Sequence, residues 1–127
     1  MKLAIEMGPI QPDSLKQTVE WVQFAERLGV EMAFAAEAWW SDAVTPLAYL
    51  ADKTHRIKLA TGIMQTTART PAMTAMSALT LHDLSGGRFV LGLGASGPQV
   101  VEGLHSNRYN KPLSRLRETV EICRMIF

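Results

Sequence analysis

The feature that most constrains the fold of this chain is a fourfold alternation of two kinds of segment. Short apolar runs rich in strand-forming residues occur at 3–7, 32–36, 57–63 and 89–93, and each is followed by a segment with helical signals. Strands that alternate with helices predict a mainly parallel sheet with helices packed on it. The runs are almost continuously apolar, which is typical of strands covered on both faces.

The predicted helices carry boundary signals in the sequence. Residues 14–17, Ser-Leu-Lys-Gln, match a capping box, and Gly29 follows the same segment as a stop. Thr45-Pro46 and Thr70-Pro71 each place a capping residue before a proline, and the helix after Thr70 is expected to stop at 85–87, Ser-Gly-Gly. A fourth helix is predicted by one apolar stripe, which consists of Leu113, Leu116, Val120, Cys123 and Phe127.

The length of the repeating unit indicates which α/β architecture the alternation belongs to. Four units in 127 residues average about 32 residues each, close to the unit of a (β/α)8 barrel of roughly 250 residues. The chain also stops at Phe127, on an apolar helical stripe and without a capping residue. We therefore predict an α/β fold in which residues 1–127 form the N-terminal half of a (β/α)8 TIM barrel, truncated after about four β-α units. The alternative is a complete four-stranded α/β domain.

Composition argues against several classes of function. With 13 Lys and Arg against 12 Asp and Glu, the net charge of +1 offers no electrostatic footprint for nucleic acid. No apolar stretch reaches the roughly 18 residues of a membrane span, and Glu6 interrupts the first run too early for a signal peptide. Cys123 is the only cysteine, and the three histidines lack metal-ligand spacing. We expect a cytoplasmic protein without a metal site, and with no nucleic-acid or membrane partner.

The residues that follow the strands are the candidates for chemistry, because function in parallel α/β proteins lies where strands end and helices begin. These segments are 7–9, 37–40, 65–69 and 94–97, and they combine small residues with polar or aromatic ones. A planar ring would stack on the tryptophans at 39 and 40, while backbone N–H groups approach it through glycines.

Gly92, Gly94 and Gly97 also satisfy the G-x-G-x-x-G pattern of dinucleotide-binding sites. The pattern follows the fourth strand instead of the first. The acids about 20 residues further on, Glu118 and Glu121, fall inside a predicted helix instead of ending a second strand. This context does not favour a Rossmann site.

Between residues 56 and 109 the sequence resembles the luciferase-like monooxygenase superfamily, in particular its coenzyme F420-dependent oxidoreductases. Weaker similarity extends through the first two units. The resemblance depends on four segments in order: RIKLATGI at 56–63, RTPA at 69–72, LSGGR at 84–88 and LGLGASGPQVVEG at 91–103.

The resemblance implies a barrel that binds FMN or the deazaflavin F420 at the carboxyl ends of its strands. It also implies a non-prolyl cis peptide between Gly62 and Ile63 that supports the ring, where a glycine would tolerate unusual dihedral angles. We place Glu37 and Gln65 near the polar edge of the ring, and Trp40 in the wall of the pocket. The full set of predicted cofactor-binding residues is Glu37, Trp40, Gly62, Ile63, Gln65, Gly94, Ala95, Ser96 and Gly97, with no catalytic residue assigned.

Two departures from the family pattern bear on the substrate. Sugar-phosphate-oxidising members have an acid followed by His after the second strand, where this chain has Glu37 and Ala38, and a carboxylate where this chain has Ala95. We therefore predict hydride transfer between F420, favoured by the run Ser-Gly-Pro-Gln at 96–99, and a small organic substrate of the CH–OH or CH–NH type. An FMN-dependent monooxygenase that uses molecular oxygen is the alternative.

A function of a different class also follows from the half-barrel. Its first and fourth strands would leave unpaired N–H and C=O groups at two edges. Such a chain would pair these edges as a homo-oligomer, most simply a dimer, and would act as a non-catalytic binding or structural partner. The 127-residue segment by itself is expected to be inactive.

Overall fold

The computed structural model describes residues 1–11 and 13–127 as alternating strands and helices. The strands are β1 (Ala4–Glu6), β2 (Met32–Ala35), β3 (Lys58–Thr61), β4 (Met64–Gln65), β5 (Phe89–Val90) and β6 (Leu93–Gly94). The helices are α1 (Leu15–Arg27), α2 (Val44–Lys53), α3 (Pro71–Leu84), a π-helix (Gln99–Leu104) and α4 (Pro112–Ile126). No helix in this described part has the length and apolar composition to cross a membrane.

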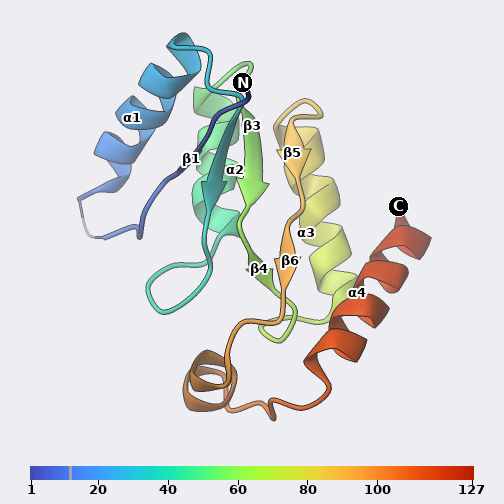
Figure 1. Ribbon diagram of the computed structural model, residues 1–127. Coiled ribbons are helices and arrows are strands. Elements are labelled where there is room, and N and C mark those ends of the chain that lie inside the picture. Colours follow the sequence, from blue (N-terminus) through green and yellow to red (C-terminus); the bar gives the residue numbers. More distant parts are fainter. Residues whose placement is uncertain (12) are drawn as a thin grey trace.

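The main sheet has the order β1-β2-β3-β5, and all of its pairs are parallel. The predicted strand runs and the parallel α/β class are therefore confirmed. In Figure 1 the strands point downward, so their carboxyl ends gather at the lower edge of the sheet, and α2 and α3 lie behind it.

The helices of the described residues cover one face of the sheet (Figure 1), which agrees with the predicted part of a (β/α)8 barrel, in which the helices form an outer ring around the strands. Each helix returns the chain to a neighbouring parallel strand in the same direction, and crossovers of one hand place every helix on the same side. The core on that side joins Ala33 and Ala35 of β2 and Leu59 of β3 to helical side chains, among them Val22, Leu47, Leu50 and Leu81.

The third apolar run forms β3 and is followed at once by a second short strand, β4, while the fourth run is divided between β5 and β6. β4 pairs with β6 in a second parallel ladder, beyond a break at which the Gly62–Ile63 peptide is cis, as the resemblance implied. The hydroxyl of Thr61 fills the break: it accepts a hydrogen bond from the N–H of Gly92 at 2.9 Å and donates to its carbonyl at 2.8 Å.

Gly62 is required here by close packing, and not by the unusual dihedral angles expected from the sequence. Its φ is outside the left-handed region, but a Cβ at this position would overlap Cδ2 of Phe34 and lie 3.0 Å from Cγ. The ring of Phe34 therefore occupies the space that a side chain at 62 would need.

The boundary signals had mixed outcomes. Thr70 caps α3 as predicted, with its side chain accepting the N–H of Met73 at 3.2 Å, and α3 ends before Ser85. Gly29 has a φ of +82° just after α1, as a helix stop requires. Ser14, however, makes no capping bond, because its hydroxyl instead bonds the backbone of Gln11.

The second helix begins one residue before Thr45, so this threonine is not its cap. The carboxylate of Asp42 has the capping role instead, and accepts both the N–H of Thr45 at 2.8 Å and its hydroxyl at 3.0 Å. An acidic side chain at the start of a helix satisfies N–H groups that have no partner inside the helix.

Only the middle of the apolar stripe on α4 is buried. Cys123 packs near the carbonyl of Pro71, and burial raises the pKa of its thiol. Leu113 and Phe127, at the two ends, are 79% and 60% exposed. The stripe predicts the helix correctly, and α4 packs on α3.

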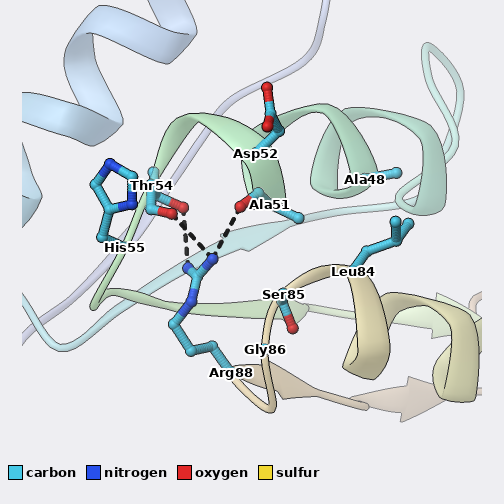
Figure 2. Close-up of a pocket in the computed structure, with 9 residues that line it drawn as sticks. All are labelled: Ala48, Ala51, Asp52, Thr54, His55, Leu84, Ser85, Gly86 and Arg88. Carbon is cyan, nitrogen blue, oxygen red and sulfur yellow. Dashed lines mark hydrogen bonds between the residues drawn. The ribbon is translucent and has the colours of Figure 1, made fainter.

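The amino ends of the strands are held together by Arg88 (Figure 2). Its guanidinium donates to the carbonyl oxygens of Ala51, Thr54 and Ile57, and to the hydroxyl of Thr54, at 2.9–3.0 Å. An open hollow of about 530 Å³ lies beside it, lined by the end of α2 and the turn after α3.

Candidate functional site

The carboxyl ends of β2 and β4 meet at the side chain of Glu37. Arg69, four residues after β4 ends, binds this carboxylate through both terminal nitrogens, with Nη1 2.8 Å from Oε2 and Nη2 2.7 Å from Oε1. Oε2 also accepts the backbone N–H of Gln65 at 2.8 Å, and Oε1 accepts that of Ala43 at 3.3 Å. The side-chain amide of Gln65 returns to the carbonyl of Glu37 at 2.8 Å.

The four donors use the full acceptor capacity of the Glu37 carboxylate, which has about four lone-pair sites. The side chains of Arg69 and Glu37 are only 16% and 6% exposed. The hydrogen bonds to Glu37 raise the pKa of Arg69, although burial alone would lower it, so the guanidinium stays charged. The pair is a buried, bidentate ion pair that links two strand ends and the start of α2.

Several buried polar atoms around this pair have no hydrogen-bond partner among residues 1–11 and 13–127. They are Oε1 of Gln65, the hydroxyls of Thr66 and Thr67, and Nε2 of His105. Buried polar groups in folded proteins are nearly always paired, so such a group of exceptions requires an explanation. Amide, hydroxyl and imidazole atoms together can both accept and donate, which suits a ligand with alternating N–H and C=O groups.

A cleft of about 350 Å³ opens beside the ion pair. Residues 37–42, Ala68, Arg69 and His105 line it. Trp40 is 75% exposed at its rim, with Trp39 beside it. Aromatic faces next to buried polar atoms provide stacking and hydrogen bonding for a planar, polar ring.

The loop after β6 is held by the segment that follows the π-helix. The hydroxyl of Tyr109 donates to the carbonyl of Ser96 at 3.3 Å, and the side chain of Asn107 donates to the carbonyl of Thr67 at 3.0 Å. Ser96 has a φ of +57°, which is uncommon for a residue other than glycine. Gly94 lies so close to Ile63 that a Cβ would be 2.7 Å from its Cγ1.

The structure brings most of the predicted site residues to one end of the sheet. Glu37 and Gln65 are in direct contact, and Ile63 packs against Gly94. Glu37 and Gln65, however, lie beneath the surface of the strand ends, and Gln65 has no exposed area. The remaining predicted residues, Trp40, Gly62 and Ala95 to Gly97, are at least partly exposed.

No site role follows from the sequence for Arg69, His105, Asn107 or Tyr109. Arg69 belongs to a strand-end segment that was identified, but no local pattern relates it to a glutamate 32 residues earlier. The G-x-G-x-x-G match is not a dinucleotide site, because Gly92 lies in the break between β5 and β6, Gly94 ends β6, and a π-helix follows them.

Comparisons with known proteins agree on one family. A family model described as luciferase-like monooxygenase matches residues 3–127. A Mycobacterium tuberculosis protein assigned as a coenzyme F420-dependent oxidoreductase is 49% identical over the whole chain, which spans 37% of that protein.

Solved structures show the same arrangement of elements. The monooxygenase RslO1 from Streptomyces bottropensis superposes with a TM-score of 0.83 at 26% identity, over 98% of this chain and 42% of its own. The coenzyme F420-dependent tetrahydromethanopterin reductase from Methanopyrus kandleri gives 0.81 at 25% identity, over 94% of this chain and 38% of its own. The chain thus spans about two fifths of each of these proteins.

Proposed function

The chain belongs to the luciferase-like monooxygenase family, and from this premise we propose that residues 1–127 form the N-terminal half of a (β/α)8 barrel domain in an F420-dependent oxidoreductase. The reaction is hydride transfer between the deazaflavin and a small organic substrate. The identity of 49% over the whole chain to a relative assigned to F420 supports this choice of cofactor.

The observation that carries the proposal is the group of unpartnered polar atoms at the carboxyl ends of the strands. The hydroxyls of Thr66 and Thr67 lie there, next in the chain to Ala68 and Arg69, and His105, whose Nε2 has no partner among the described residues, lines the cleft together with Trp39 and Trp40. A deazaflavin ring has an edge of alternating carbonyl and N–H groups and two flat apolar faces. The residues present therefore fit this group.

Individual residues have different roles in this proposal. Gly62 and Ile63 support one face of the ring, Trp40 lies in the wall of the pocket, and the backbone from Ala95 to Gly97 contacts the cofactor. Because the Glu37 carboxylate is saturated by protein donors, Glu37 and the buried Gln65 act by placing neighbouring atoms. When bound, the deazaflavin gives or accepts a hydride, while the protein supplies binding and orientation.

FMN-dependent monooxygenation is the second candidate. It is favoured by the similarity to a monooxygenase at 26% identity over 98% of the chain. Reduced FMN reacts with oxygen and the reduced deazaflavin does not readily do so, so the bound cofactor decides between the two reactions.

We also propose a homodimer. Met73, Met76 and Leu79 on α3 are large apolar side chains exposed on the described surface, and α3 is apolar around most of its circumference. A helix of this kind is normally buried. Light scattering of the full-length protein tests this, and a stable monomer would contradict it.

Titration of the full-length protein with F420 and FMN separately tests the proposed function. We expect saturable binding of F420, followed by its reduction by a small CH–OH or CH–NH donor. Tight binding of FMN without binding of F420 would replace the first candidate by the second. Binding of neither would favour the non-catalytic half-barrel and refute both.

A further inference from the structure

In the ion pair between Glu37 and Arg69, protein donors occupy all the hydrogen-bond acceptor sites of the carboxylate. Each carboxylate oxygen accepts two hydrogen bonds, one of them from Arg69 and the other from a backbone N–H. A carboxylate in this state has no lone pair left to bind a ligand. Glu37 can therefore affect a binding site only indirectly, by fixing the positions of the residues that are hydrogen-bonded to it.

Stability alone does not account for such a pair. Two charged groups lose their hydration when they are buried, and an apolar pair of similar volume is often as stable or more so. A bidentate guanidinium–carboxylate pair does, however, fix relative position, because two parallel hydrogen bonds define both distance and orientation. The pair lies at the carboxyl ends of the strands, where relative position governs ligand binding.

The segment fixed by the pair is 65–69. At its first residue, Gln65 donates its backbone N–H to the Glu37 carboxylate and its side-chain amide to the Glu37 carbonyl. At its last residue, Arg69 binds the same carboxylate. Both ends of a five-residue segment are thus anchored to one side chain, and Thr66 and Thr67 between them have unpartnered hydroxyls.

We infer that Arg69 is a positioning residue, which acts through Glu37 and Gln65 to hold Thr66 and Thr67 in the geometry that binds the ring of the cofactor. This inference rests on the proposed function. It assigns Arg69 no contact with the cofactor or with the reacting atoms. The variants R69K and E37Q should therefore impair the same step for the same reason.

The experiment measures F420 affinity by fluorescence titration of the full-length protein, and melting temperature, for R69K, E37Q and the double variant. R69K keeps the charge but loses the planar two-donor fork. R88K is the matched control, because it alters another half-buried guanidinium, which makes four hydrogen bonds at the other end of the sheet and is not part of the site.

We expect R69K and E37Q each to weaken F420 binding about 10-fold or more, as is typical for residues that orient a direct contact. The double variant should lose about the same factor and not the product, because both changes break one unit. R88K should lower the melting temperature while F420 affinity stays within about twofold of the wild type.

Other outcomes overturn the inference. Affinity within twofold of wild type in R69K, a multiplicative loss in the double variant, or an equal loss of affinity in R88K would each do so. Hydrogen exchange at the N–H of Gln65 separates the failure of the inference from that of the proposed function. If wild type binds no F420, the proposed function fails. Unchanged exchange in E37Q and R69K would show, independently, that the pair does not hold the segment.

Discussion

Two half-buried arginines, Arg69 and Arg88, lie at opposite ends of the same sheet and bind different kinds of partner. Arg88, at the amino ends of the strands, donates to three carbonyl oxygens and a threonine hydroxyl, all of them neutral acceptors. Arg69, at the carboxyl ends, binds one carboxylate through two parallel hydrogen bonds. Glu26 complements Arg88 at the amino ends, because it accepts the N–H groups of residues 55, 56 and 57.

The difference shows that charged side chains have different roles at the two ends of the sheet. At the amino ends, charged side chains satisfy backbone groups that the loops leave unpaired, which serves stability. At the carboxyl ends, an ion pair holds a segment in which Gln65, Thr66 and Thr67 retain unpartnered polar atoms. In (β/α)8 barrels the carboxyl ends bear the active site and the amino ends bear stability, and the site proposed for this chain follows that division.

The largest expected effect tests the amino ends. Arg88→Met removes the donors of three buried carbonyl groups at once, so we expect a loss of about 2–4 kcal/mol in the free energy of unfolding, with water from the adjacent hollow limiting the cost. Urea denaturation of the full-length protein measures this loss. F420 affinity under native conditions should be unchanged. A large loss of F420 affinity with a small loss of stability would contradict the assignment of stability to the amino ends and of binding to the carboxyl ends.

Substitutions of Gly62 test whether close packing at the carboxyl ends of the strands excludes a side chain at this position. Gly62→Ala forces the new Cβ against the ring of Phe34, and overpacking of this kind costs about 1–3 kcal/mol. Phe34→Leu in the same chain should recover part of the loss, and a double-mutant cycle of unfolding free energies measures the recovery. Additive losses would mean that the Phe34 ring is not the obstacle.

The matched substitution at Ala60, a buried residue of β3 on the other side of Thr61, separates affinity from stability. Ala60→Val should cost stability by overpacking, about 1–3 kcal/mol, without a specific loss of F420 binding. Gly62→Val should weaken binding further than its effect on stability explains. Equal losses of F420 affinity in the two variants would show that Gly62 serves packing alone and has no specific role in binding.

Asp42 is expected to have a smaller effect, restricted to the start of α2. Asp42→Ala removes the acceptor of the Thr45 N–H and should lower stability by about 1 kcal/mol. Ser14→Ala is its control, because Ser14 makes no capping bond, and it should cost less. Thermal unfolding of both variants makes the comparison, and a larger loss in Ser14→Ala would contradict these cap assignments.

The smallest effect concerns pH and the amino ends. Burial would raise the pKa of Glu26, but the backbone N–H groups of residues 57, 56 and 55 outweigh it and lower the pKa. The charged carboxylate therefore adds stability above the ordinary glutamate pKa of about 4.3, and this is lost as pH falls through the lowered value. Glu26→Gln should be less stable than wild type at pH 7, by less than about 1 kcal/mol because solvent screens the site. Urea unfolding should show the difference closing toward pH 3, and a constant difference would exclude the ionised carboxylate as its source.

Local signals in the sequence were sufficient for the order of elements. The four apolar runs, the cap at Thr70 and the stop at Gly29 depend on residues within a few positions of each other. The sequence pattern therefore predicted them as the structure has them. The caps at Ser14 and Thr45 were wrong because other groups close in the chain compete for the same hydrogen bonds. Asp42 took the role at α2, and Ser14 bonded to Gln11.

The sequence by itself determined the parallel α/β order, the strand-end segments and the family. Only the tertiary structure decided that Arg69 pairs with Glu37, that Phe34 fills the space above Gly62, and that the third and fourth strands break at the same level. The reason is distance along the chain: Glu37 and Arg69 are 32 residues apart, and they meet because the register of β2 on β3 pairs Ala35 with Thr61. Side chains that carry no local signal become partners only when the sheet brings their strand ends together.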